Sequence, residues 1–332
     1  MPMRVRYDHL PTEQRHPASR DLDRLSVTGV LRLMSREDAR AVRAVARRHR
    51  QIARAIRLIV LALRRGGRLV FVGAGTSGRL GVLEAAECPP TFSTPPSLVQ
   101  AIIAGGRGAV FRSREGAEDR RADGRSAIAL RVRRHDVVVG IAASGVTPFV
   151  DEALRVARRL GARTVLITGH PRTRIRAHVM IPLAVGPEIL SGSTRLKTAT
   201  ATKLVLNMLT LGTMVQLGKT YGNLMVDVRP SSRKLRARAV TIVQTLTRSS
   251  RAAAAESLRQ AHGRVKVAVL MASLGLVSSQ TLRTKRKFAI FWIFVVSAAL
   301  TPSTDAGTQV AMALPIVVLY ELSLLAMRFR GL

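Results

Sequence analysis

The chain has 332 residues, enough to bury a full α/β core together with a small second unit. Its single cysteine, Cys88, excludes an internal disulfide and is typical of a reducing compartment. The net charge of +34 favours binding to nucleic acid or anionic lipid. However, the excess positive charge is mostly arginine, and the aromatic residues on which bases would stack make up only 4% of the chain. We interpret the charge as a compositional drift toward arginine, with non-specific polyanion binding as a side effect, and expect no specific nucleic-acid partner.

The N-terminal region is polar and charged, without the apolar run of a secretory signal peptide, so we expect a cytoplasmic protein. We assign residues 1–50 to an N-terminal arm and helix. A long helix is predicted from Arg36 to Arg65, because apolar residues recur along one face of it. That face carries Ile52, Ile56, Ile59 and Leu63.

Strand-like and helical runs alternate after this helix. The strand-like runs are Leu69 to Val72, Leu98 to Ile103, Val137 to Ala142, Thr164 to Ile167 and Val179 to Pro182. The helical runs lie near Gly78 to Glu87, Arg114 to Arg131, Pro148 to Leu160 and Thr194 to Leu217. This alternation predicts an α/β fold with a doubly wound parallel sheet, whose ligands bind beyond the carboxyl ends of the strands.

A glycine-rich loop, Gly73-Ala74-Gly75-Thr76-Ser77-Gly78-Arg79, follows the first strand and begins a helix. The loop suits an anion because amides at a helix N-terminus lack partners and lie at the positive end of the dipole. Thr76 and Ser77 add hydroxyl donors. The spacing is neither the dinucleotide fingerprint nor the Walker loop, so a purely structural turn is the alternative.

Glu87 follows about three helical turns later, before Pro89-Pro90, which we expect to stop the helix. A carboxyl group close to a bound phosphorylated substrate is a candidate acid or base. Cys88 beside it is either a reactive thiol or a packed cysteine, and we favour the packed one. The seven histidines show no metal-ligand spacing with Cys88 or with carboxylates, so we expect no metal and no cofactor.

Residues Gly73 to Phe92 closely resemble the signature of the N-acetylmuramic acid 6-phosphate etherase family, a member of the sugar isomerase (SIS) fold group. Further motifs match in order: Thr12-Glu13-Gln14-Arg15, Asp21-Leu22-Asp23, Glu115-Gly116-Ala117-Glu118-Asp119, Ala143-Ser144-Gly145, Gly186-Pro187-Glu188, Gly192-Ser193-Thr194-Arg195-Leu196-Lys197, Asn207-Met208 and Tyr221-Gly222-Asn223-Leu224-Met225-Val226-Asp227. The resemblance covers residues 10–275. It implies an SIS sugar-phosphate domain over residues 51–225 and a small helical unit over residues 231–280.

The resemblance implies a homodimeric, cofactor-free lyase of cell-wall sugar recycling. Its reaction converts N-acetylmuramic acid 6-phosphate to N-acetylglucosamine 6-phosphate and D-lactate by elimination and hydration. The resemblance implies that Glu87 and Glu118 are the catalytic carboxylates, and we assign Glu87 as the acid at the ether oxygen and Glu118 as the base at the sugar carbon. From spacing alone, Glu118 would be one acid among many on a solvated helix.

The same resemblance implies a set of residues that bind the substrate, chiefly its phosphate. They are Gly75, Thr76, Ser77, Ser144, Thr147, Ser193 and Thr194. For Ser193 and Thr194 the alternative role is capping of the next helix, which is compatible with anion binding. Arg195 and Lys197 would add charge, or would lie on an exposed basic face.

Three positions depart from the family pattern. Val146 stands where an arginine is usual, and a lost charged contact costs about 1.5–3 kcal/mol. Ala199 replaces a glycine and would obstruct a close backbone approach. His16 replaces an asparagine in the arm. We expect the fold to tolerate all three, whereas activity depends on them.

The C-terminal region differs in character. A basic run, Thr281 to Lys287, precedes an apolar stretch from Phe288 to Leu300, and a turn at Thr301–Asp305 leads to a second apolar stretch, Val310 to Met327. We predict a transmembrane hairpin over residues 285–330, with both ends in the cytoplasm, which anchors the protein to the inner face of the plasma membrane. The first stretch is short for a span, and a pair of buried soluble helices is the alternative.

This tail resembles the last two membrane helices of the C subunit of the twin-arginine translocase, with a join near Leu274 to Thr284. The matching residues are Arg286-Lys287-Phe288-Ala289-Ile290, Leu300-Thr301-Pro302, Ala313-Leu314-Pro315 and Leu319-Tyr320-Glu321-Leu322-Ser323. Besides the lyase, two functions stay open: a non-catalytic SIS regulator that binds a sugar phosphate, and a membrane-anchored fusion with a translocase fragment. Retention of both Glu87 and Glu118 argues against the regulator.

Overall fold

The computed structural model describes residues 9–273, 286–300 and 306–329. The join predicted near Leu274 to Thr284 and the turn at Thr301–Asp305 lie outside the described residues. The chain divides into two compact units, Met1–Met225 and Val226–Leu332. Each unit is described by itself.

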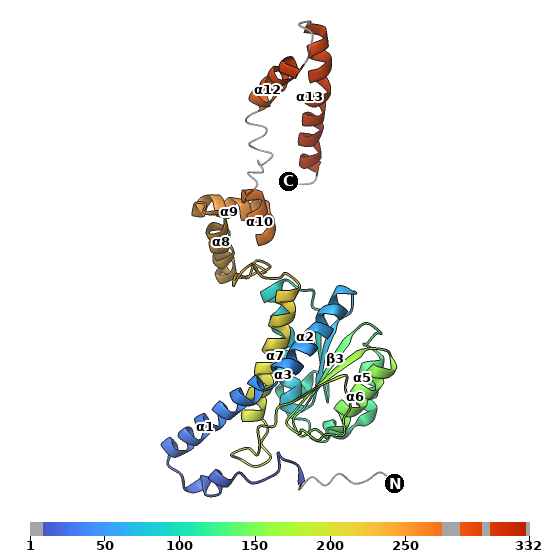
Figure 1. Cartoon of the computed structure of the whole chain (residues 1–332), viewed down its shortest axis with the longest axis vertical. Coiled ribbons are helices and arrows are strands. Elements are labelled where there is room, and N and C mark those ends of the chain that lie inside the picture. Colours follow the sequence, from blue (N-terminus) through green and yellow to red (C-terminus); the bar gives the residue numbers. More distant parts are fainter. Residues whose placement is uncertain (1–8, 274–285, 301–305, 330–332) are drawn as a thin grey trace. The chain divides into compact units, whose positions relative to one another are not determined.

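A five-stranded sheet in the order β2-β1-β3-β4-β5 forms the centre of the first unit (Figure 1). All its neighbouring strands are parallel, as predicted from the alternating pattern. The strands are β1 (Leu69–Gly73), β2 (Val99–Ile103), β3 (Val137–Ala142), β4 (Arg163–Thr168) and β5 (Val179–Pro182). In the register, Phe71 pairs with Ala101 on one side and with Val139 on the other.

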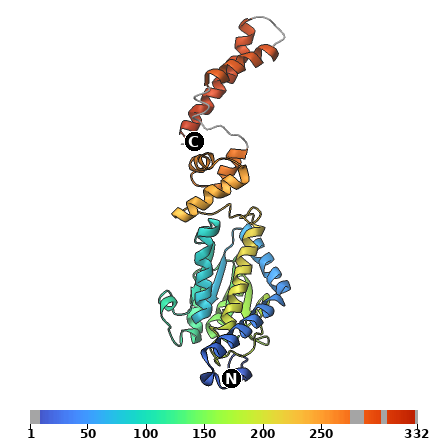
Figure 2. The ribbon, with the colours of Figure 1, turned by 90° about the vertical axis from the view of Figure 1, so that its left-hand side faces the viewer.

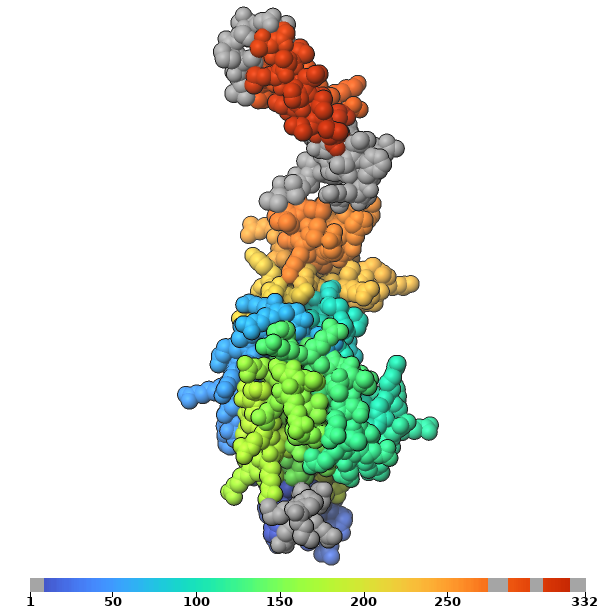
Figure 3. Space-filling view, turned by 90° about the vertical axis from the view of Figure 1, so that its right-hand side faces the viewer, coloured from blue at the N-terminus to red at the C-terminus, as the bar shows by residue number. Residues whose placement is uncertain are grey.

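Helices cover both faces of the sheet, and a separate apolar core lies on each side. One core contains α1 (Val27–Ala46), α2 (His49–Arg64), α7 (Lys197–Gln216) and the second half of α3 (Gly75–Phe92). The other contains α5 (Arg121–Ala129) and α6 (Pro148–Arg159), which form the green outer face in Figure 3. Burial on both faces explains why the strands read as continuous apolar runs.

Two predicted helices are interrupted. The long helix from Arg36 to Arg65 is two helices, α1 and α2, which meet at Arg47–Arg48. Arg48 Nε donates to the carbonyl of Pro182 at 2.6 Å, which fixes the break against β5. The run from Arg114 to Arg131 contains only a short turn, η4 (Ala117–Asp119), before α5, because Gly116 at φ 73° reverses the chain.

Two helix ends also differ from the prediction. Helix α3 passes through Pro89 and Pro90 and ends at Phe92, where Ser93 adopts a left-handed conformation. Helix α7 begins at Lys197 rather than at Thr194, because the side chain of Glu188 accepts hydrogen bonds from the first two amides of the helix. The Glu188 carboxylate accepts from the Lys197 amide at 3.2 Å and from the Thr198 amide at 2.9 Å.

The second unit is helical, as expected for residues 231–280 as far as the structure describes them. Helices α8 (Arg233–Thr247), α9 (Arg251–Gln260) and α10 (Val265–Ser273) pack on one another (Figure 2). Helices α12 (Arg286–Leu300) and α13 (Ala306–Phe329) pack as a pair, joined by an ion pair of 2.7 Å between Arg286 Nε and Glu321 Oε1. Between them they contain the two predicted apolar stretches.

Across the described ranges, no helix combines the length and the apolar character that a membrane crossing requires. The prediction of a transmembrane hairpin over residues 285–330 is therefore not supported. Helix α12 has 15 residues and is about 22 Å long, against about 30 Å for the hydrocarbon core of a bilayer. Helix α13 contains Pro315, and its Glu321 is half of an ion pair.

Candidate functional site

A pocket of about 330 Å³ opens at the carboxyl ends of the strands, where the sequence analysis places ligand binding. Ala74, Ala104 and Ala143 line it, and each directly follows a strand: β1, β2 and β3 respectively. The pocket therefore lies beside β1 and its two neighbours in the sheet, β2 and β3. Two of the helices that begin at this edge, α3 and α6, direct their N-termini toward it.

The first wall is the start of α3, with Gly75, Thr76 and Ser77. The glycines of this loop are needed for its geometry. Gly75 has φ 52°, and a Cβ on Gly78 would lie 2.6 Å from Cγ1 of Ile103 on β2. The close packing of α3 on β2 places amides of the first helical turn, together with both hydroxyl side chains, at the pocket, as an anion requires.

The second wall is the turn between β3 and α6, with Ser144 and Thr147. Gly145 between them has φ 73°, and its carbonyl accepts a hydrogen bond from the hydroxyl of Thr173. Thr147 is the N-cap residue of α6, and its side chain makes no capping hydrogen bond, so the hydroxyl is available to a ligand. The structure thus brings both predicted hydroxyl-bearing turns to one pocket.

Carboxylates form a third wall. Glu118 and Glu115 line the pocket from the segment around η4, and Glu13 reaches it from the N-terminal arm. The arm is held in place because the amide of Gly192 donates to the carbonyl of Thr12 at 3.0 Å. A Cβ on Gly192 would lie 3.0 Å from Oε2 of Glu13, so the glycine makes room for this carboxylate.

Sequence reasoning missed Glu13 as a pocket residue. Its motif, Thr12 to Arg15, carried the family resemblance, but no local pattern places an arm residue beside β1 and β3. Two arginines were also missed. Arg79 lines the pocket and donates from Nε to the carbonyl of Val110 at 2.9 Å, and Arg114 packs over Gly105 and Gly108. These two guanidinium groups supply positive charge at the pocket, whereas Val146, which stands where the family usually has an arginine, supplies none.

The other predicted residues have different positions. Thr194 lines the pocket, whereas its neighbour Ser193 does not. Neither caps α7, whose N-cap position is Leu196, so the capping alternative is wrong. Glu87 is exposed on α3, outside the lining, about 18 Å along the helix from Gly75. Within one chain, the structure therefore does not bring Glu87 and Glu118 together in this pocket.

A buried charge cluster underlies the arm. Lys197, predicted to supply charge near the phosphate or on an exposed face, is instead fully buried, with Nζ 2.6 Å from Oε2 of Glu37. The Nε2 of His16 lies 3.1 Å from the same oxygen. Burial raises the pKa of Glu37, but the hydrogen bond and the charge of Lys197, with smaller contributions from His16 and Arg40, outweigh it and hold the pKa below its usual value.

The thiol of Cys88 is buried and donates to the carbonyl of Glu84 at 3.4 Å. Burial, followed by the charges of Glu84 and Glu87, raises the pKa of this thiol to about 12. The packed alternative is therefore confirmed and the reactive thiol is wrong. In the part of the chain that the structure describes, no group of three or more histidine, cysteine, aspartate or glutamate side chains is arranged to hold a metal ion.

Comparison with family models gives three matches. The glucokinase regulatory protein N-terminal SIS domain matches residues 51–158, and the SIS domain matches residues 120–212. The Sec-independent protein translocase protein (TatC) matches residues 265–315, in agreement with the resemblance seen in the tail. That match covers too little of the chain to assign it to the translocase family.

Among solved structures, the phosphoheptose isomerase from Neisseria gonorrhoeae is similar, with 16% identity and a TM-score of 0.45 over 59% of this chain and 100% of that one. Sequence relatives are much closer. The N-acetylmuramic acid 6-phosphate etherase of Gloeobacter violaceus is 56% identical, over 79% of this chain and 87% of its own length. That of Nostoc sp. is 55% identical, over 81% and 88%. The chain belongs to the N-acetylmuramic acid 6-phosphate etherase family.

Proposed function

We propose that the chain is a lyase that converts N-acetylmuramic acid 6-phosphate to N-acetylglucosamine 6-phosphate and D-lactate. The observation that carries this proposal is the composition of the pocket. Hydroxyl groups and helix N-termini that suit a phosphate face the same space as the Glu118 carboxylate. Arg79 and Arg114 line the same pocket and favour an anionic substrate.

The reaction proceeds in two parts. A base removes the proton from the sugar carbon beside the carbonyl, and the bond between the neighbouring carbon and the ether oxygen breaks as an acid protonates the departing lactate. Water then adds across the resulting double bond, which gives the hydroxyl of the product. We assign the base to Glu118 and the acid to Glu87, because two carboxylates in different protonation states can divide these steps.

This assignment requires a homodimer in which Glu87 of a second copy faces the pocket. The exposed face of α3 supports such pairing. Leu83 lies one helical turn before Glu87 and is 45% exposed, while Leu211 on the neighbouring helix α7 is 54% exposed. These two leucines, on helices that pack on each other, are apolar surface that a second copy would bury. A two-fold interface over α3 would bring Glu87 of each copy toward the other copy.

The reaction is tested by incubating the purified chain with N-acetylmuramic acid 6-phosphate and measuring D-lactate. We expect lactate release that falls about 10²–10⁴-fold in Glu118→Gln and in Glu87→Gln, since each removes a proton-transfer group. No lactate from the unmodified chain, with the sugar phosphate still bound, would instead indicate a non-catalytic regulator. Lactate undiminished in Glu87→Gln would remove Glu87 from the mechanism.

The shared site is tested separately by co-expressing Glu87→Gln and Glu118→Gln chains with different affinity tags. A mixed dimer with a shared site contains one site with both carboxylates intact, so the doubly purified dimer should recover up to half of the activity per dimer. Two carboxylates from the same chain would leave every site damaged, and the mixed dimer would then stay as inactive as either variant.

We further propose a cytoplasmic location. The supporting observation is the single, buried thiol of Cys88. Phosphorylated amino sugars are charged and need a transporter to cross a bilayer, which agrees with an enzyme that meets its substrate inside the cell. Fractionation of cells that produce the chain, with immunodetection in each fraction, tests this location.

A further inference from the structure

A second hollow lies at the opposite edge of the sheet. It has a volume of about 450 Å³ and is formed by the amino ends of β3, β4 and β5 together with the last turns of α2. The length of β3 alone separates the two edges by about 20 Å, so this hollow is distinct from the pocket that contains Glu118. Nothing in the proposed lyase reaction uses it.

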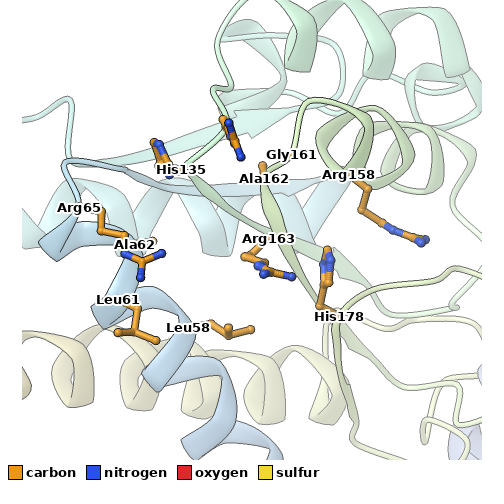
Figure 4. Close-up of a pocket in the computed structure, with 11 residues that line it drawn as sticks. Leu58, Leu61, Ala62, Arg65, His135, Arg158, Gly161, Ala162, Arg163 and His178 are labelled. Carbon is orange, nitrogen blue, oxygen red and sulfur yellow. The ribbon is translucent and has the colours of Figure 1, made fainter.

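The polar side chains of this hollow are basic. Four arginines line it, Arg65, Arg134, Arg158 and Arg163, together with two histidines. Among the described residues that line the hollow there is no carboxylate. In Figure 4, Arg163 lies between Arg65 and His178, and Leu58 and Leu61 of α2 form an apolar side below them.

The charges of these four arginines are not offset by acidic side chains among the described residues. As far as the described residues extend, none of the four forms an ion pair with an aspartate or a glutamate. Arg68 nearby pairs with Asp136 at 2.7 Å, and Arg125 pairs with Glu152 at 3.0 Å. Asp136 is next to the hollow in sequence, but it is buried and already paired with Arg68.

The histidine His178 is held in one tautomer. Its Nδ1 accepts a hydrogen bond from the amide of Thr164 at 3.0 Å, so this nitrogen carries no proton and Nε2–H is the donor. Partial desolvation of the ring, followed by the charges of Arg163, Arg158 and Arg54, lowers the pKa of His178. The imidazole therefore adds a neutral donor beside the guanidinium groups.

Helix dipoles do not account for the whole cluster. Basic residues at helix C-termini offset the negative end of the dipole, which explains Arg65 after α2 and Arg158 in the last turn of α6. Arg163 is the first residue of β4, and Arg134 lies three residues before β3, so both follow the last helical turns of α6 and α5. The stem of Arg134 packs over Gly161, where a Cβ would lie 3.0 Å from it, so a glycine leaves room for this arginine.

We propose that this hollow, the amino-edge site, binds a small molecule that carries two or three linked phosphate groups. A single phosphate ester carries about −1.5 to −2 charges and would balance only about half of the four guanidinium groups. Arginine forks match phosphate oxygens in bidentate fashion, and Leu58 and Leu61 offer a surface for the rest of the molecule. A single-stranded nucleic acid fits less well, because no phenylalanine, tyrosine or tryptophan among the described residues lines the site for base stacking.

The test is calorimetric titration of the full chain with tripolyphosphate at 0.15 M salt, compared with orthophosphate and with a 20-nucleotide single strand. We expect one saturable site per chain, with orthophosphate at least tenfold weaker. Binding without saturation, or equal affinity for orthophosphate, overturns the proposal. The proposal is also overturned if the oligonucleotide displaces tripolyphosphate when it supplies a lower concentration of phosphate groups. That result would indicate a nucleic-acid surface.

A matched pair of variants separates the amino-edge site from general charge. Arg65→Gln with Arg163→Gln removes two charges from the site, and Arg32→Gln with Arg43→Gln removes two from the exposed face of α1. We expect at least a tenfold loss of tripolyphosphate affinity in the first and less than a twofold loss in the second. Equal losses show that the net charge alone attracts the ligand. Arg134→Gln with Arg158→Gln is a second site variant if the first does not fold.

Discussion

Glu37 is a buried carboxylate in the first unit, and the cost of burying its charge is offset by the basic side chains around it. Lys197 and His16 both approach one of its oxygens, while Arg40 bonds the carboxylate from the surface, with Nη1 2.9 Å from Oε1. The cluster joins three segments: the arm, α1 and the start of α7. His16, where the family usually has asparagine, is thus part of the anchor that holds Glu13 at the pocket.

We predict that Glu37→Gln lowers the free energy of unfolding at pH 7 by about 3–5 kcal/mol, because Lys197 is left buried without a counter-charge. The folded-state pKa of Glu37 lies below its usual value of 4.5, so its contribution is present above pH 4.5 and is lost as the pH falls through the folded-state pKa. Urea unfolding of both proteins at pH 7 and pH 4 should therefore show that Glu37→Gln loses less free energy of unfolding, relative to the unmodified chain, at pH 4. Glu37→Gln combined with Lys197→Met is the control and should recover stability. A difference that grows with acid contradicts this account.

Glu13 gives a second prediction at this scale. Its carboxylate faces the pocket, where it would accept hydrogen bonds from hydroxyl or amide groups of the substrate. A hydrogen bond to a charged group contributes about 1.5–3 kcal/mol, so Glu13→Gln should raise KM about tenfold or more and change kcat little. Steady-state lactate release measures both constants. Glu256→Gln, an exposed acid on α9, is the control. A fall in kcat with KM unchanged would show that Glu13 transfers a proton instead.

In helix α3, close packing at Gly78 positions the helix start that lines the pocket. Its first turn contacts β2 closely because Gly78 has no side chain against Ile103. Gly29 occupies a comparable position near the start of α1, but a Cβ there meets its nearest neighbour at an ordinary 3.4 Å. The two glycines are therefore matched in helix position and differ in surroundings.

We predict that Gly78→Ala destabilises the chain by about 1–3 kcal/mol and raises KM, since overpacking displaces the start of α3. Gly29→Ala should stabilise by up to about 1 kcal/mol, because alanine is the better helix former. Thermal unfolding and lactate release measured on both variants make the comparison. Equal destabilisation would mean that contact with Ile103 does not limit this position.

Ala199 was expected to obstruct a backbone approach. It lies instead within the first turn of α7 and does not line the pocket. We predict that restoring the family's glycine, Ala199→Gly, lowers stability by up to about 1 kcal/mol and leaves KM unchanged. An increase in activity in the glycine variant would restore the obstruction hypothesis.

For the whole molecule, the division into two units separates the candidate chemistry from the tail. Every residue that lines the pocket belongs to the first unit, and the relatives align over about 271 residues of this chain. A chain ending at Ser273 retains α8, α9 and α10 but lacks α12 and α13. We predict that this truncated chain keeps kcat/KM for lactate release within about twofold, since the described residues that line the pocket all lie between Glu13 and Thr194. A folded but inactive truncated chain would assign the tail a part in catalysis.

Much of the fold could be predicted from sequence because the relevant signals are local. Apolar runs separated by helical periods define a parallel sheet, and a glycine loop after the first strand defines an anion-binding helix start. Thr76 and Ser77 were predicted from this loop, whereas Ser144 and Thr147 were predicted from the family resemblance. The break between α1 and α2 was not predictable, because the contact that fixes it joins Arg48 to Pro182, far along the chain.

The sequence by itself therefore determined the class of fold, the two hydroxyl-bearing turns and the family, since each is encoded within a few neighbouring residues. Only the tertiary structure decided that Glu13, Arg79 and Arg114 share the pocket, that Lys197 is buried and that Glu87 lies outside. The reason is physical. Burial and ion pairing depend on which distant segments meet, whereas helix period and turn geometry depend on adjacent residues.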